Sequence, residues 1–438
     1  MALPLAAASD AGAAVVFEER FDGLCRRHRE LWRRTDETTP RLGPATTRFH
    51  RWRNARAARS LIDRLAAEIP RYPEALAERG PWRESLRAMV SRFGEERLGW
   101  PAGYRRLFFA DAFFDATASF SREARAFDPE IGTEELMQAL RNVWILNSLQ
   151  MLLDLEVRLT PAAFAYSMLY PCTDNLLDDP SLPMAAKRDL GRQLGQRLAG
   201  GPVAAADEAQ GRIWRLLERI EGQYPRAAFP EVWCSLQAIH AGQVDSLRQQ
   251  TEPAGSRGAR GDALGPDRLL AISVAKGGAS VLADGYLVTG RLAPAEADFC
   301  FGYGVFLQLL DDLQDARTDR RAGHATLFSA AEPPLDRLAG RLHRFMRSVV
   351  EGNKRFAGPR YAARRDLILR NCTTLLVGAA AEEPRLFSRP FRSALERRWP
   401  LGLAAIRRLR RRADRRLRHA AAELQQRRGV DSLLDLAG

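Results

Sequence analysis

Apolar residues recur three and four positions apart along most of the chain, the spacing that places them on one face of an α-helix. The stretch 133–159 shows this clearly, because Thr133 at its start is followed by Glu134 and Glu135, a cap-like residue before an acidic first turn. Strand-like alternation and internal repeats are not evident, so the chain is expected to be all-α. Further helical patterns occupy 16–66, 161–179, 185–199, 207–224, 230–250, 268–290, 294–317 and 334–352.

Breaks in this pattern suggest how the chain is divided. The alanine-rich segment 1–16 has no basic start, is interrupted by Asp10, and is interpreted as a disordered tail. Prolines then cut the next region into short helices and turns, giving an expected helical extension over 17–100. A larger helical domain is expected over 101–430, with its clearest loop at 251–265, which is dense in glycine and charge.

Composition limits the classes of function. The chain has 438 residues, 46% of them apolar, so it can bury a large core, and its net charge is +13. The positive charge comes mostly from arginine, since Lys187, Lys276 and Lys354 are the only lysines. Such a surplus suits nucleic acid, an anionic membrane surface or a phosphorylated substrate. The arginine run 407–418 is interpreted first as a solvated helix face, then as a membrane contact, and last as a nucleic-acid site.

The cysteines indicate the compartment. Five cysteines are scattered without metal-ligand spacing, which is typical of reduced thiols, so a cytoplasmic protein is expected. No apolar run is long enough to predict a transmembrane helix, whereas peripheral membrane contact stays open.

Two acidic clusters carry the main chemical signal. Asp174 and Asp178 stand four residues apart, and so do Asp311, Asp315 and Asp319, with Asp312 adjacent. Residues four apart share one face of a helix, where each like-charged pair costs about 3 kcal/mol at ~6 Å and an effective dielectric near 20. Both clusters follow apolar helical stretches, which favours the rim of a greasy cavity over open water. Carboxylates in this arrangement suit Mg²⁺, which binds one or two of them together with substrate phosphates.

These motifs resemble those of the class I isoprenoid synthases, the superfamily of polyprenyl diphosphate synthases and class I terpene cyclases. The segment Gly304-x-x-x-Gln308-x-x-Asp311-Asp312-x-x-Asp315 looks like that family's second aspartate-rich motif, and Asp174-Asn175-x-x-Asp178 resembles the first. Lys276, followed by Gly277-Gly278, is similar to its diphosphate-binding lysine, and Gly242-Gln243-Val244-Asp245 resembles a Gly-Gln-x-x-Asp element that is one residue short. The likeness covers roughly half the chain, over 105–328.

The resemblance implies a helical bundle around a central apolar pocket, with the two acidic clusters facing each other across its mouth. It also implies three Mg²⁺ ions that hold an allylic prenyl diphosphate, which ionises to diphosphate and a carbocation, and it extends to a homodimer. Metal ligands by this resemblance are Asp174, Asp178, Asp311, Asp312, Asp315 and Asp319, with catalysis assigned to Asp174, Asp178, Asp311 and Asp315. Diphosphate ligands would be Lys276, Gln243, Arg320 and Arg321, and the pocket would include Tyr166, Tyr170, Phe306 and Gln308.

Departures from the family pattern favour a cyclase-like enzyme. The Gly-Gly-Lys-Arg and Arg-Arg-Gly elements of chain-elongating synthases are missing. Residues 180–183 stand where the Arg-Arg-Gly element would follow the first motif. Asp311, Asp315 and Asp319 match the three ligand positions of the cyclase triad, here all aspartate. The alternatives are a polyprenyl diphosphate synthase, which adds isopentenyl diphosphate, and a basic all-α protein that binds nucleic acid or membranes. Asp284 and Tyr286 are further pocket candidates.

Overall fold

The computed structural model describes residues 5–40, 42–101, 104, 111–178, 183–246, 249 and 264–428, and the regular elements within these ranges are helices. No β-strand occurs among them, which confirms the all-α prediction. No helix in the described part of the chain has the length and apolar character needed to span a membrane.

The helices fall into two compact units, each assembled from separate stretches of sequence. Unit 1 comprises 1–37, 130–332 and 341–369, and unit 2 comprises 38–129, 333–340 and 370–438. The boundaries predicted near residues 16 and 100 do not coincide with these divisions, because both units combine N-terminal and C-terminal segments.

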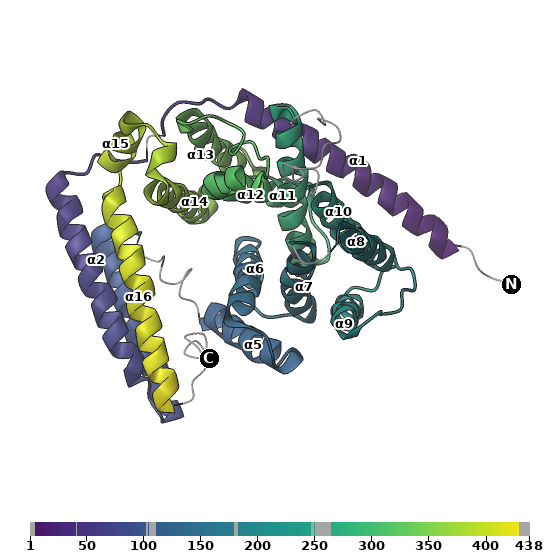
Figure 1. The fold of residues 1–438 in the computed structure, drawn as a ribbon, viewed down its shortest axis with the longest axis horizontal. Helices are drawn as coiled ribbons and strands as arrows, with labels where there is room; N and C mark the ends of the chain where they lie inside the picture. The colour runs from purple at the N-terminus through teal and green to yellow at the C-terminus, as the bar shows by residue number, and fades with distance from the viewer. Residues whose placement is uncertain are drawn as a thin grey trace. The chain divides into compact units, whose positions relative to one another are not determined.

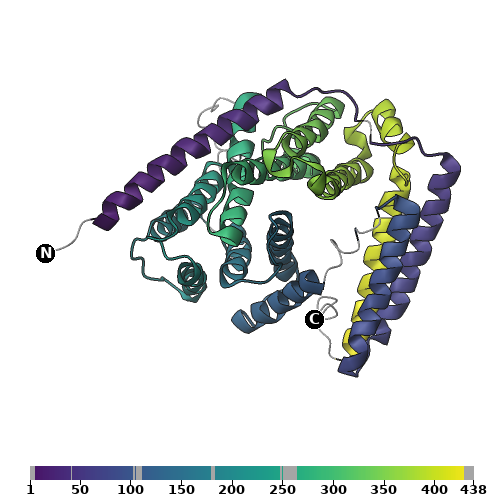
Figure 2. The same cartoon turned by 180° about the vertical axis from the view of Figure 1, so that it is seen from behind.

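Unit 1 is built around one buried helix, α11, in which almost every residue from Leu269 to Leu287 is buried. Helices α10 and α12 lie along it, and α1, α6 and α7 also contact it (Figures 1 and 2). Since most side chains of α11 are apolar and buried, the helix requires this cover from several neighbours. The helices of this unit are α1 (Leu5–Arg34), α6 (Thr133–Leu152), α7 (Pro161–Asp178), α8 (Met184–Leu198), α9 (Glu208–Gln223), α10 (Pro230–Ser246), α11 (Pro266–Thr289) and α12 (Pro294–Ala322).

Helix α1 differs from its expectation, because it begins at Leu5 and includes most of the segment interpreted as a disordered tail. The segment is rich in alanine, the residue with the highest helix propensity, so it extends the amphipathic helix that follows. That helix buries Phe17, Leu24 and Trp32. Figure 1 shows α1 crossing the outside of α10 and α11.

Unit 2 contains a set of helices in which α2 and α16 lie side by side (Figure 2). Ile69, Tyr72 and Leu424 are buried together between them. Pro70 ends α2 in a turn of 3₁₀-helix as predicted, whereas Pro81 lies inside α3 and does not interrupt it. The α-helices wholly in this unit are α2 (Arg48–Glu68), α3 (Leu76–Phe93), α5 (Asp111–Phe127), α15 (Arg389–Arg397) and α16 (Leu403–Arg428).

The remaining segments are α13 (Asp336–Glu351) and α14 (Ala362–Glu382), which contribute to both units. Short turns of 3₁₀- or π-helix complete the described chain at Ile69–Arg71, Gly94–Leu98, Lys354–Phe356, Pro359–Tyr361 and Pro384–Leu386.

Candidate functional site

Helix α12 is buried over much of its length and exposed near its C-terminal end. The second acidic cluster of the chain lies at this exposed end. Most side chains from Ala297 to Leu310 are buried, whereas Asp311 and Asp315 are exposed. Gly323, with φ 73°, ends the helix in a left-handed conformation that glycine adopts without strain. The acids therefore occupy the solvent-facing end of an otherwise buried helix, and their predicted position at the rim of an apolar cavity stays a prediction.

Asp312 is the exception within the cluster, because its carboxyl is buried and held by neutral groups. Ser273 Oγ of α11 donates a hydrogen bond to Oδ2 at 2.8 Å, and Gln308 Nε2 donates one to Oδ1 at 2.8 Å. Burial raises the pKa of Asp312 to about 6, the two hydrogen bonds oppose that rise, and the charges of Asp311 and Lys276 act in opposite directions. Gln308, which the resemblance places in the pocket, orients this carboxyl, and its place in a pocket stays a prediction.

Asp319 and Asp315 show that the acid ladder is electrostatically unfavourable. Partial burial and then the charges of Asp312, Asp315 and Asp311 together raise the pKa of Asp319 to about 7, against the opposing charge of Lys276. Burial also raises the pKa of Asp315, an effect that Arg141 of α6 opposes. The like charges predicted from the four-residue spacing therefore do perturb one another, and a cation bound among them would relieve the repulsion.

A glycine contact brings α11 and α12 together beside these acids. A Cβ on Gly304 would lie 2.1 Å from the carbonyl oxygen of Gly277, and one on Gly277 would lie 2.4 Å from Gln308 Cβ. Only glycine permits so close an approach of the two backbones. Helix α10 is also close at this level, because a Cβ on Gly242 would lie 3.0 Å from Lys276 Cα. These contacts fix Lys276 near the carboxylates, where its charge acts on both Asp312 and Asp319.

Two residues of this cluster were missed by the sequence analysis. Ser273 lies one helical turn before Gly277, so its position on the α12-facing side could have been inferred from helical spacing once the glycine contact was known. Arg141 is an exposed residue of α6 and belongs to no motif, so the sequence contained no signal for it.

The first acidic cluster lies on the last turns of α7, where the structure describes the backbone only. Asp174 and Asp178 belong to this helix, but their side chains, and that of Tyr170, lie outside the described residues. Both acid-bearing helices nevertheless belong to unit 1 and both contact α11.

The remaining pocket candidates are not gathered around one large cavity. Tyr166 and Gln243 line a small cavity of about 20 Å³ among α7, α8 and α10. Phe306 is fully buried within α12. A larger cavity of about 310 Å³ in unit 1 lies elsewhere, beside His28 and Asp298. The central apolar pocket therefore remains a prediction.

The two arginines after the cluster have different surroundings. Arg320 donates from Nε to the carbonyl of Ser329 at 2.8 Å, and a second guanidinium nitrogen donates to the carbonyl of Ala331. It therefore ties the end of α12 to the next loop and would have to leave these carbonyls to bind diphosphate. Arg321 is exposed.

The acidic cluster of α12 is also the candidate metal site. Within the described ranges, no group of three or more histidine, cysteine, aspartate or glutamate side chains is arranged to hold a metal ion. Asp311, Asp315 and Asp319 still offer oxygen donors on one helix face, and Mg²⁺ that is bound with phosphate needs only one or two carboxylates. The donor chemistry of α12 thus fits a substrate-linked Mg²⁺ better than a metal cage made wholly by protein.

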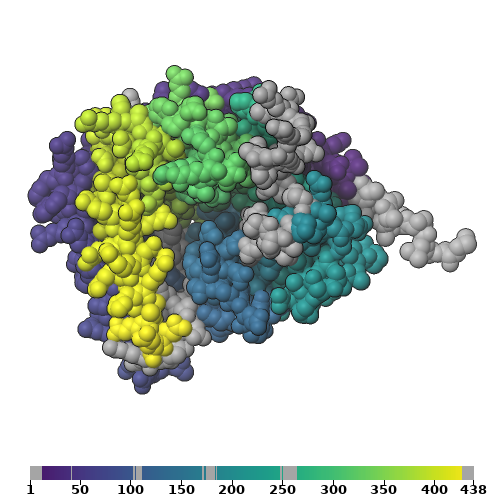
Figure 3. Space-filling model, in the orientation of Figure 1, coloured from purple at the N-terminus to yellow at the C-terminus, as the bar shows by residue number. Residues whose placement is uncertain are grey.

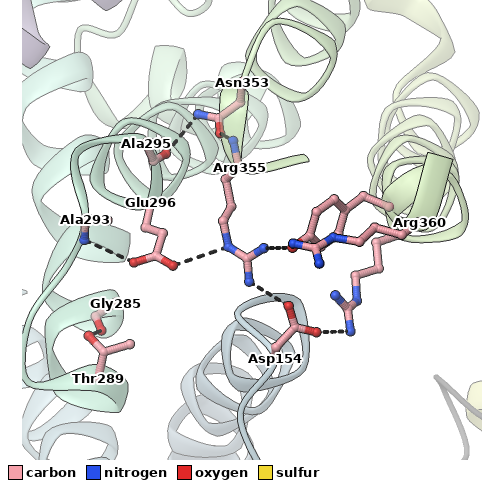
Figure 4. Close-up of polar contacts among 11 residues, drawn as sticks. Asp154, Gly285, Thr289, Ala293, Ala295, Glu296, Asn353, Arg355 and Arg360 are labelled. Carbon is pink, nitrogen blue, oxygen red and sulfur yellow. Dashed lines mark hydrogen bonds and ion pairs between the residues drawn. The ribbon is translucent and has the colours of Figure 1, made fainter. Parts of the chain in front are cut away.

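At the other end of α12 an ion-pair network holds the surrounding elements (Figure 4). Arg355 contacts Asp154 at 2.8 Å and Glu296 at 3.2 Å, and Arg364 pairs with the other oxygen of Asp154. These arginines lower the pKa of Asp154, whose backbone adopts φ 64° just after α6. Since Glu296 and Asp311 are fifteen residues apart, the network lies about 22 Å along the helix from the acids and has a structural role.

One further acid is buried in unit 1. The side chain of Asp284 on α11 is fully buried, and neither of its oxygens has a hydrogen-bonding partner in the described structure. Burial raises the pKa of Asp284 well above its usual range, and the nearby Asn142 amide only partly opposes this. Burial therefore disfavours the ionised form of this carboxyl, which is a polar group in an interior that the resemblance predicts to be apolar. Comparison of the chain with protein-family models, curated proteins and solved structures found no match.

Proposed function

We propose that this protein is a Mg²⁺-dependent enzyme that ionises an allylic prenyl diphosphate, in the manner of class I terpene cyclases. The observation that carries the proposal is the group formed by Asp312, Asp319 and Lys276. Helix packing brings the positively charged Lys276 side chain beside these two carboxyls, whose pKa values are raised. The raised pKa values are typical of functional sites, where burial and like charges are tolerated for the sake of chemistry.

Each part of the group has a distinct task in this proposal. Asp311 and Asp315 are exposed and would supply oxygen ligands for Mg²⁺, which stabilises negative charge on the departing diphosphate. Lys276 would bind diphosphate oxygens directly. Ser273 and Gln308 hold Asp312 in one orientation. Breaking the carbon–oxygen bond leaves the electron pair on diphosphate and the positive charge on the allyl group, which an apolar surrounding protects from water.

The direct test is incubation of the purified protein with geranyl, farnesyl and geranylgeranyl diphosphates and Mg²⁺. Diphosphate release is measured, and products are identified by gas chromatography. We expect turnover of at least one substrate, and its loss in the double variant Asp311→Asn/Asp315→Asn. The chain offers a matched control in Asp111 and Asp115, an exposed pair four residues apart on α5, whose double asparagine variant should retain activity.

Binding of Mn²⁺, followed by electron paramagnetic resonance in the presence of inorganic diphosphate, gives a readout independent of turnover. It should weaken at least about tenfold in the Asp311/Asp315 variant and stay unchanged in the Asp111/Asp115 variant. Chain elongation on addition of isopentenyl diphosphate would identify a prenyl diphosphate synthase instead. Absence of turnover, together with unchanged Mn²⁺ binding in the Asp311/Asp315 variant, would refute the proposal that the cluster binds a catalytic metal ion.

A further inference from the structure

The first turns of α2 expose two aromatic side chains next to each other. Phe49 is 63% exposed and Trp52 is 58% exposed, and their rings stack with centroids 6.0 Å apart. Large aromatic side chains are usually buried in a folded domain, and a contiguous exposed pair indicates an interaction surface.

The same turns are strongly basic. Between residues 38 and 62 the chain has six arginines and no aspartate or glutamate. Arg48, Arg53, Arg56 and Arg59 are all exposed on α2. The guanidinium of Arg56 lies over the ring of Trp52, 5.9 Å from its centroid. The aromatic pair is therefore surrounded by positive charge on one helix.

This part of α2 is held firmly in unit 2. Thr47 caps the helix by accepting a hydrogen bond from the His50 amide at 3.2 Å. The Thr46 amide donates to the carbonyl of Arg397 at 2.7 Å, and Arg51 donates to the carbonyl of Glu396 at 3.0 Å. Phe49 and Trp52 are thus displayed by an anchored helix start, and their exposure does not result from a frayed end.

Helix α16 extends the positive surface. It lies beside α2, and Arg412 binds both carboxylate oxygens of Asp63, at 2.7 and 2.8 Å. That contact neutralises the first acid on α2. Between residues 407 and 418, α16 has eight arginines and Asp414 as the sole acid. The space-filling view shows α16 exposed along its length (Figure 3).

We propose that α2 and α16 form a docking surface for an anionic lipid bilayer, in which Phe49 and Trp52 enter the headgroup region and the arginines bind lipid phosphates. An aromatic side chain on a basic helix face is the usual composition of an interfacial helix. Single-stranded nucleic acid would require open ring faces on which bases can stack. Here the two rings stack on each other with centroids 6.0 Å apart, and Arg56 lies over Trp52, so part of the ring faces is already occupied and the pair is better suited to insertion into lipid.

The test is co-sedimentation of the full chain with vesicles of phosphatidylcholine alone and of equal parts phosphatidylcholine and phosphatidylglycerol. Binding is expected to the anionic vesicles and to weaken with salt. The variant Phe49→Ala/Trp52→Ala should bind at least about tenfold more weakly. Leu76→Ala is the matched control, because Leu76 is 77% exposed on α3 and lies outside the aromatic pair.

Charge is tested separately. Arg53→Gln should weaken binding about fivefold, the equivalent of about 1 kcal/mol for one arginine near an anionic surface, whereas Arg122→Gln on the exposed face of α5 should not. Circular dichroism confirms that the variants fold. Equal binding by the aromatic variant and the native chain would overturn the proposal. So would stronger binding to single-stranded RNA that competes with the vesicles.

Discussion

Replacing Asp312 with asparagine should make the protein more stable above neutral pH while removing the proposed activity. Asparagine has nearly the same shape, and its amide group can still exchange hydrogen bonds with Ser273 and Gln308, the two partners of the carboxyl. The substitution therefore removes the ionisable group with little change in packing.

The magnitude follows from the pKa of Asp312, which burial raises from 3.8 to about 6. A raised carboxyl pKa means that the folded protein binds a proton where the unfolded chain has lost it, so stability falls as pH rises from about 4 to about 6 and is constant above. That pKa difference corresponds to about 3 kcal/mol. The free-energy advantage of Asp312→Asn should therefore grow by up to about 3 kcal/mol between pH 4 and pH 7.

Urea unfolding of both proteins at these two pH values measures the difference, with Mg²⁺ omitted so that bound metal does not offset the charge. Asp189→Asn is the control, because Asp189 is exposed on α8 in the same unit and should show little pH-dependent effect. An advantage of Asp312→Asn that is the same at both pH values would show that ionisation of Asp312 does not oppose folding. A stabilised variant that keeps full activity would separate Asp312 from the proposed reaction.

Three further substitutions test the packing and ion pairs. Arg355→Ala should lower the free energy of unfolding by about 2 kcal/mol, because it removes the partner of two carboxylates at once; an unchanged melting temperature in calorimetry would contradict this. Gly304→Ala should destabilise unit 1 by several kcal/mol, since its Cβ would lie 2.1 Å from a backbone oxygen, whereas Gly222→Ala, with open space around it, should be neutral or slightly stabilising in urea unfolding. Asp63→Asn should cost at most about 1 kcal/mol, because its pair with Arg412 is about one-third exposed. Arg412 lowers the pKa of Asp63, so this cost should disappear in unfolding experiments as pH falls below about 4 and also at high salt.

The helices were largely predictable because their limits are set by local chemistry. Glycine ends α12 at residue 323, and proline begins α11 and α12, as ordinary capping rules suggest. The end of α6 was not predictable. The helical pattern continued to residue 159, but the helix ends at Leu152, and Asp154 follows in a left-handed conformation held by Arg355, which is 201 residues away in the chain. Helix propensity depends on neighbouring residues only, so it could not predict a helix end that is set by so distant a partner.

The same limit applies to the site. The carboxylates could be named from spacing, since helical periodicity predicts which residues of one helix share a face. Lys276 was named from the family resemblance. The partners of Asp312 and Asp315 on other helices could not be named, because Ser273 and Arg141 approach through helix packing. The division into two units was also hidden, because each unit joins segments from both ends of the chain.

The acids of α12 are difficult to explain as a structural device. The positive charges that lower their pKa values come from Lys276 and Arg141, yet the pKa values of Asp312, Asp315 and Asp319 all remain raised. The two hydrogen-bonding partners of Asp312 are neutral groups that an asparagine would satisfy equally well without an ionisation cost. A site selected for stability alone would thus favour amides here. Several carboxylates within nine residues, incompletely neutralised by the folded chain, are better explained if further positive charge is supplied during function, which is what Mg²⁺ bound with a diphosphate would provide.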